Sequence, residues 1–146
     1  MIDQFIAAML GTLAFVIIFN VPRKEYLYCA VNGGIGWLTY LFLFQHSSSI
    51  VISSLGATLF LTLSARILSI IRRCPVTIFL VTGIFVLVPG AGIYYTAYYL
   101  ITNELAQAGV KGLETFKIAG AIVIGIIFGF AIPQGWLNRL QRNDNK

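Results

Sequence analysis

Five long apolar runs, separated by short polar clusters, constrain this sequence more than any other feature. Each run approaches the roughly 20 residues that an α-helix needs to cross the hydrocarbon core of a bilayer. Only 10% of the 146 residues are charged and 58% are hydrophobic, whereas a typical soluble domain has about 25% charged residues. So few charges cannot cover the surface of a water-soluble globule. The sequence therefore predicts an integral membrane protein embedded in a lipid bilayer.

The apolar runs are continuous rather than alternating, which favours helices over the strands of a membrane barrel. We expect a single all-α transmembrane domain over residues 1–146. Its five helices are predicted at residues 3–21, 26–44, 50–71, 76–101 and 116–137, and a polar tail follows at 138–146.

Lys and Arg residues are unequally distributed between the helix ends, and cytoplasmic loops of membrane proteins carry the excess. An N-terminus outside the cell places eight basic residues on the cytoplasmic side, namely Arg23, Lys24, Arg66, Arg72, Arg73, Arg139, Arg142 and Lys146. It leaves Lys111 and Lys117 outside. We therefore predict an external N-terminus and a cytoplasmic C-terminus. Because the basic residues flank apolar runs, the net charge of +5 does not indicate a nucleic-acid partner.

A proline followed by two glycines interrupts the fourth predicted helix. Pro89 lacks a backbone donor and clashes with the preceding turn, and Gly90 and Gly92 permit backbone conformations that other residues avoid. We expect the helix to break here, near the bilayer centre. Non-helical backbone at that depth persists only inside protein or beside a water-filled cavity. The amides at the start of the following half-helix would attract an anion such as a carboxylate.

The residues around this break have two interpretations, and both stay open. Pro89 either only kinks the helix, with the following tyrosines in an interfacial aromatic belt, or it shapes a substrate cavity that the tyrosines line. Asn32, a polar residue in the second predicted helix, either bonds across helices or lines the same cavity. The candidate substrate-binding residues are Pro89, Gly90, Gly92, Tyr94, Tyr95 and Asn32.

Two further features concern packing. Ala121, Gly125 and Gly129 repeat every four residues, a pattern that lets helices approach closely, and we expect them to form a helix contact. Arg66 is the one basic residue well inside an apolar run. Its long side chain can extend to the membrane interface. A charge facing the bundle interior would instead indicate function.

Catalytic and metal chemistry find no support in the sequence. The intramembrane serines have no partner base, and the single histidine, His46, lies in a polar loop without a second ligand. Cys29 and Cys74 lack the close spacing of a metal or redox pair. We therefore expect neither an enzyme nor a bound metal or cofactor.

Several short segments, in this order along the chain, resemble the small-subunit domain of the threonine/serine exporter (ThrE-like) family. They are GTLAF at 11–15, FNVPRK at 19–24, GGIGW at 33–37, RRCP at 72–75, LVPG at 87–90, and the glycines at 120 and 125. The resemblance implies export of L-threonine and L-serine, or of a dicarboxylate such as succinate, across the bacterial cytoplasmic membrane. It also implies a partner, the larger membrane subunit of a two-component exporter.

The resulting hypothesis is the small membrane subunit of a secondary exporter, since the sequence has no nucleotide-binding P-loop. Two alternatives stay open. The chain is either a structural or assembly subunit that carries no substrate, or it forms a channel by self-association.

Overall fold

The computed structural model describes residues 2–133, and all regular structure within them is helical. The order of elements is α1 (Ile2–Ile18), η1 (Arg23–Glu25), α2 (Tyr26–Ser47), α3 (Ile50–Arg72), α4 (Val76–Ile84), α5 (Gly90–Ile101) and α6 (Leu105–Ala131). The predicted all-α class is confirmed. Among the described residues, three segments are long and apolar enough to cross a membrane: Arg23–Ser47, Ile50–Arg72 and Leu105–Ala131.

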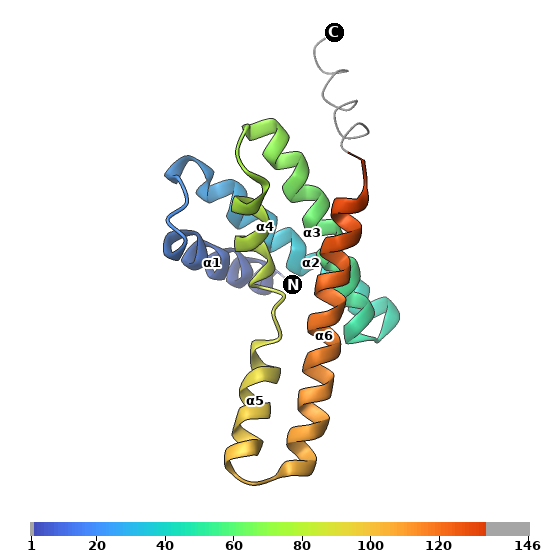
Figure 1. The fold of residues 1–146 in the computed structure, drawn as a ribbon. Coiled ribbons are helices and arrows are strands. Elements are labelled where there is room, and N and C mark those ends of the chain that lie inside the picture. The colour runs from blue at the N-terminus through green and yellow to red at the C-terminus, as the bar shows by residue number, and fades with distance from the viewer. Residues whose placement is uncertain (1, 134–146) are drawn as a thin grey trace.

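Helix α3 occupies the centre of the molecule. It packs against α2 on one side and α6 on the other, and α4 lies against both α2 and α3. Helix α5 packs on α6, and this pair extends beyond the other helices (Figure 1). We call α5 together with residues 105–116 of α6 the α5–α6 arm.

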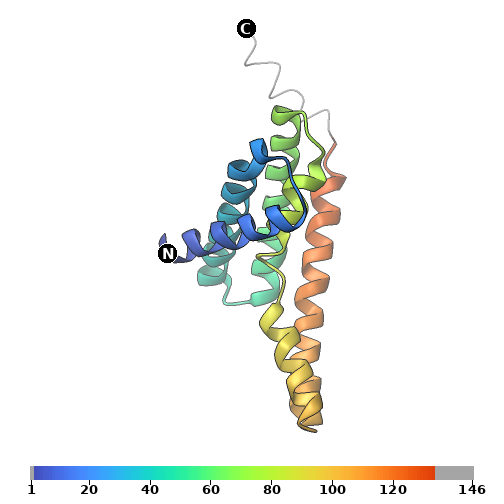
Figure 2. The same cartoon turned by 90° about the vertical axis from the view of Figure 1, so that its left-hand side faces the viewer.

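Helix α1 differs from the first predicted span. It ends at Ile18 rather than at residue 21, because Asn20 adopts a left-handed backbone conformation (φ 51°) and Pro22 follows. It packs on α2 and runs steeply across the direction of α6 in both views (Figures 1 and 2). Its 17 residues are fewer than the roughly 20 that a perpendicular crossing requires. A membrane crossing by residues 3–21 stays a prediction.

Helix α6 begins at Leu105, so the prediction that it starts at residue 116 is wrong. Residues 102–115 were expected to form an external loop. Most of them instead continue the helix, which is stabilised by an ion pair one turn apart between Lys111 Nζ and Glu114 Oε2 (2.9 Å). A search for continuous apolar residues misses an extension of mixed polarity like this one. The predicted helix end at 137 and the tail at 138–146 lie outside the described residues.

The chain between α4 and α5 is not helical. Pro89 (φ −76°, ψ 63°) is at the centre of an inverse γ-turn, in which the Gly90 amide donates to the Val88 carbonyl at 2.8 Å. Neither Gly90 nor Gly92 has a positive φ. The expectation that these glycines supply unusual backbone conformations is therefore wrong, because the proline itself makes the turn.

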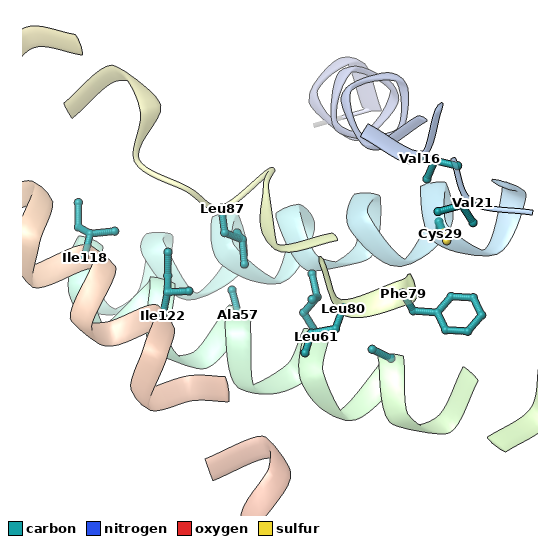
Figure 3. Close-up of a cluster of buried hydrophobic side chains, with 11 residues drawn as sticks. Val16, Val21, Cys29, Ala57, Leu61, Phe79, Leu80, Leu87, Ile118 and Ile122 are labelled. Carbon is teal, nitrogen blue, oxygen red and sulfur yellow. The ribbon is translucent and has the colours of Figure 1, made fainter. Parts of the chain in front are cut away.

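Leu87 anchors this non-helical segment. Its side chain is buried in the same cluster as Ala57 and Leu61 of α3 and Ile118 and Ile122 of α6 (Figure 3). Burial of a leucine side chain contributes about 1.5–3 kcal/mol. The segment is therefore held against the bundle, although besides the γ-turn its backbone bonds are those from the Leu87 and Val88 amides to the Ile84 carbonyl, at 2.8 and 3.2 Å.

The contact between α3 and α6 depends on glycines. A Cβ atom at Gly125 would lie 2.8 Å from the Leu55 carbonyl oxygen, and one at Gly129 would lie 2.5 Å from the Thr62 methyl carbon. Both distances are too short for any larger residue in this arrangement. The predicted helix contact is confirmed for Gly125 and Gly129, and Ala121 is buried on the same helix.

Polar side chains of α3 on this face bond within their own helix. The hydroxyl of Thr58 donates to the Ser54 carbonyl at 2.7 Å, and that of Thr62 donates to the Thr58 carbonyl at 2.8 Å. Both threonines are fully buried. Since their hydroxyls already have hydrogen-bond partners, α6 can pack against these threonines and every buried hydroxyl still has a partner.

Arg66 is buried, with 4% of its surface exposed, so the interpretation that its side chain extends to the membrane interface is wrong. Its Nη1 atom donates to the carbonyls of Gly129 and Ile132 at 2.6 and 2.7 Å. These carbonyls belong to the C-terminal end of α6, where a positive charge also stabilises the helix dipole. The close α3–α6 contact brings Arg66 within reach of them.

Glu25 and Arg72 join two basic segments of the chain. The Glu25 carboxylate is buried and lies 2.9 Å from Arg72 Nη2, and the guanidinium also lies over the Tyr28 ring at 4.3 Å from its centroid. Residues 23–24 and 72–73 therefore lie at one end of the bundle. This grouping is what the predicted orientation requires, although the orientation itself stays a prediction.

Gly125→Ala tests the glycine contact. We expect a loss of about 1–3 kcal/mol in stability, because the added methyl group meets the backbone of α3. The matched change is Gly120→Ala on the same helix, where a Cβ would meet nothing within 4 Å. There we expect a gain of roughly 0.5–1 kcal/mol from helix propensity. Denaturation of both purified variants in detergent measures the difference, and equal stabilities would contradict the packing described here.

Arg66→Met tests the role of the buried guanidinium. Methionine retains much of the side-chain volume but leaves the Gly129 and Ile132 carbonyls without their donor, which costs about 1–3 kcal/mol. Arg23→Met, at an exposed position, serves as the control and is expected to change stability by less than about 0.5 kcal/mol. Thermal unfolding in detergent compares them. A silent Arg66→Met would mean that Arg66 does not hold the end of α6.

Candidate functional site

A cavity of about 420 Å³ lies where the non-helical segment meets the bundle and the α5–α6 arm. Its wall combines aromatic side chains from α2, backbone of the non-helical segment, and polar side chains from α3 and α6. The lining comprises Trp37, Tyr40, Ile50, Ser54, residues 86–92, Tyr95, Lys111, Glu114, Thr115 and Ile118. The volume is within the usual range for small-molecule sites.

Helix α5 begins at this cavity. Within the described chain, the amides of Ala91 and Gly92 have no carbonyl partner, and no side chain caps the helix. The γ-turn at Pro89 produces this start, because it redirects the chain immediately before the first helical turn. Free amides and the positive end of the helix dipole give this part of the wall an affinity for anions.

The two glycines of the segment have different surroundings. A Cβ at Gly92 would overlap the Thr115 side chain of α6, whereas a Cβ at Gly90 would meet nothing within 4 Å. Gly92 therefore allows α5 to approach α6 closely. Gly90 leaves space beside the start of the helix, so the cavity wall is open there.

Lys111 and Glu114 add a charged pair to the wall. Their side chains are 46% and 41% exposed and are joined by the 2.9 Å ion pair. Sequence reasoning missed both residues, because it assigned them to an external loop. One signal was available in the sequence: the two opposite charges are three residues apart, as in an ion pair on one face of a helix. Extending the fifth predicted helix towards the N-terminus would have placed both residues on it.

The predicted site residues fall into separate groups. The structure brings Pro89, Gly90, Gly92 and Tyr95 together at the cavity. Tyr94 is 63% exposed and stacks on Tyr98, with ring centroids 6.4 Å apart. Tyr94 is not part of the lining of this cavity.

Asn32 lies elsewhere, between α2, α3 and α4. Its Nδ2 atom donates to the Phe79 carbonyl at 3.3 Å, and its Oδ1 atom accepts from the Ser64 hydroxyl at 2.5 Å. It is 3% exposed and borders a second groove of about 380 Å³, which is lined by residues of α2 and α3. Asn32 thus bonds across helices and is separate from the cavity at Pro89.

Within residues 2–133, no three His, Cys, Asp or Glu side chains gather closely enough to hold a metal ion. The polar groups of the cavity are amides, hydroxyls and one ion pair. They can bind a small polar or charged molecule by hydrogen bonds and electrostatic attraction.

The family model described as "Threonine/Serine exporter, ThrE" matches residues 4–132, which is most of the chain. No solved structure matches the chain.

Single cysteines at the two glycines test whether the cavity holds water. The background replaces Cys29 and Cys74, which are both free thiols, by alanine. We expect a membrane-impermeant, water-soluble thiol reagent to label Gly90→Cys in membranes open on both sides at least about ten times faster than Gly92→Cys, which Thr115 blocks. Adding Thr115→Ala to Gly92→Cys is expected to raise its labelling. No labelling at Gly90→Cys would contradict a water-filled cavity here, and equal rates at both positions would contradict the block of Gly92 by Thr115.

Proposed function

Because this chain belongs to the threonine/serine exporter (ThrE) family, we propose that it is the small membrane subunit of a secondary exporter. Membership in that family, with three helices long enough to cross a membrane among the described residues, makes it a multi-pass membrane protein with a transport role. The proposed substrates are small carboxylate-bearing metabolites, with L-threonine and L-serine first. A dicarboxylate such as succinate is the alternative substrate.

The position of the start of α5, at the cavity, is the observation that supports a substrate site here. Two amides without carbonyl partners in the described chain lie beside Pro89. A carboxylate at this position would accept hydrogen bonds from both amides, and transporters use half-helix ends for this purpose. Pro89, Gly90, Gly92 and Tyr95 are the proposed substrate contacts. Asn32 and Tyr94 do not border this cavity, and a direct role for them requires a different site.

Exposed apolar side chains on the α5–α6 arm support the proposed partner. Ile101, Leu105 and Phe116 are 85%, 64% and 76% exposed. At the helical rise per residue, residues 105–116 extend about 18 Å beyond the start of α3. If α2 and α3 span the bilayer, the arm projects past its core, and apolar surface of this kind requires a protein cover. A larger membrane subunit of the same exporter is the proposed cover.

The proposed location is the bacterial cytoplasmic membrane, with the basic end of the bundle at the cytoplasm. Gly125 and Gly129 are occupied by the contact with α3 inside one chain. They are therefore not available for self-association. This supports an exporter subunit over a channel made of this chain alone.

Efflux measurements test this proposal. Labelled L-threonine, L-serine and succinate are loaded into cells that lack their own exporters, and the chain is expressed alone or with its larger partner. We expect efflux of the hydroxy-amino acids with both subunits and none with either subunit alone. In the same complex, Gly90→Leu is expected to reduce efflux about tenfold or more, because it fills the space beside the amides of α5. Gly120→Leu, away from the cavity, is expected to retain it.

The alternatives give different results in this assay. Efflux with this chain alone would indicate a channel formed by self-association. Efflux that is unaffected by Gly90→Leu, with both subunits folded in the membrane, would indicate a structural or assembly subunit.

A further inference from the structure

We propose that the Lys111–Glu114 ion pair binds the two charged groups of a zwitterionic amino acid, so that the cavity accepts α-amino acids and rejects dicarboxylates. The inference rests on the proposed function, because it assigns the substrate class of the same cavity.

The first observation is the contrast between the two ion pairs in residues 2–133. The Glu25 carboxylate is buried, and both of its oxygens accept hydrogen bonds from the Arg72 guanidinium. Lys111 and Glu114 share one contact, from Nζ to Oε2, and are nearly half exposed. Within the described chain, Glu114 Oε1 and the other two Nζ protons have no partner. This second pair therefore has hydrogen-bonding capacity left for a ligand.

The second observation is the position of the pair. Lys111 and Glu114 are one helical turn apart on the cavity wall formed by α6, and the start of α5 forms another part of the same wall. The contact between Gly92 and Thr115 fixes α5 against α6 at this level. A ligand in the cavity thus meets a positive group, a negative group and the free amides of α5.

The charges of the pair match those of an amino acid. The ligand carboxylate would bind Lys111 Nζ and the α5 amides, while the ligand ammonium would donate to Glu114 Oε1. The dipole of the bound amino acid is then antiparallel to the dipole of the Lys111–Glu114 pair, which is the favourable arrangement of two dipoles that lie side by side. Neither the pair nor the zwitterion has net charge, so binding leaves the net charge of the cavity unchanged.

A dicarboxylate lacks this match. One of its carboxylates would bind Lys111 and the amides, but the second would approach the Glu114 carboxylate or lie in the apolar part of the cavity. Repulsion between like charges opposes the first arrangement, and the loss of hydration of a carboxylate opposes the second. Glu114 is therefore the residue that selects for the ammonium group, and Lys111 balances its charge.

The test compares three probes in the two-subunit complex. They are L-threonine, succinate, and 3-hydroxybutyrate, which is threonine without its ammonium group. For Glu114→Gln we expect threonine efflux to fall about tenfold or more, while efflux of 3-hydroxybutyrate is unchanged or rises. The charge-swapped double variant Lys111→Glu/Glu114→Lys retains an ion pair but places a carboxylate beside the ligand carboxylate that the α5 amides hold, and we expect its threonine efflux to fall about tenfold or more. Glu104→Gln and Lys117→Met remove charges on or beside α6 that do not border the cavity, and neither is expected to change the substrate ratio.

Each outcome decides the inference. A ratio of threonine to 3-hydroxybutyrate that is the same in Glu114→Gln and in the wild-type complex would overturn the role of the pair, while the proposed function stands because the complex still exports. Unchanged threonine efflux in the charge-swapped variant would also overturn it, which keeps the test valid if Glu114→Gln does not fold. A wild-type complex that exports none of the three probes would overturn the proposed function together with this inference.

Discussion

The close contact between α3 and α6 is the constraint on which the rest of the structure depends. Gly125 and Gly129 let the two helices approach until α6 lies on the backbone of α3. At this separation Arg66 reaches the carbonyls that end α6. The same register determines where α6 leaves the bundle, so that its first part extends as the α5–α6 arm and Glu114 borders the cavity (Figure 1).

The cavity exists because one segment is held in the bundle without being helical. Leu87 is buried in one cluster with residues of α3 and α6 (Figure 3), and the γ-turn at Pro89 redirects the chain shortly after it. Gly92 then lets α5 pack on Thr115. The polar groups of the resulting site are the amides at the start of α5, hydroxyls and one ion pair.

Much of the fold follows from local patterns. Continuous apolar runs predict the helices, and α2 and α3 begin at the predicted residues because each follows a polar cluster. The repeat of small residues predicts the contact at Gly125 and Gly129. The start of α6 was not predictable by the same criterion, because Lys111 and Glu114 look like a loop when only apolar content is considered. Helical continuity with mixed polarity is a weaker signal than uninterrupted hydrophobicity.

The sequence by itself determined that this chain is a helical membrane protein interrupted at Pro89, because composition and proline chemistry act locally. The tertiary structure decided what each polar residue does. Arg66 became a buried cap rather than an interfacial charge, Asn32 became a bridge between helices, and Lys111 with Glu114 joined the cavity wall. The physical reason is that a polar group in an apolar environment needs a hydrogen-bonding or charged partner, so its role depends on which partner the fold brings to it. The partners of these residues are far away in the sequence, or they lie on a part of α6 that hydrophobicity alone did not reveal.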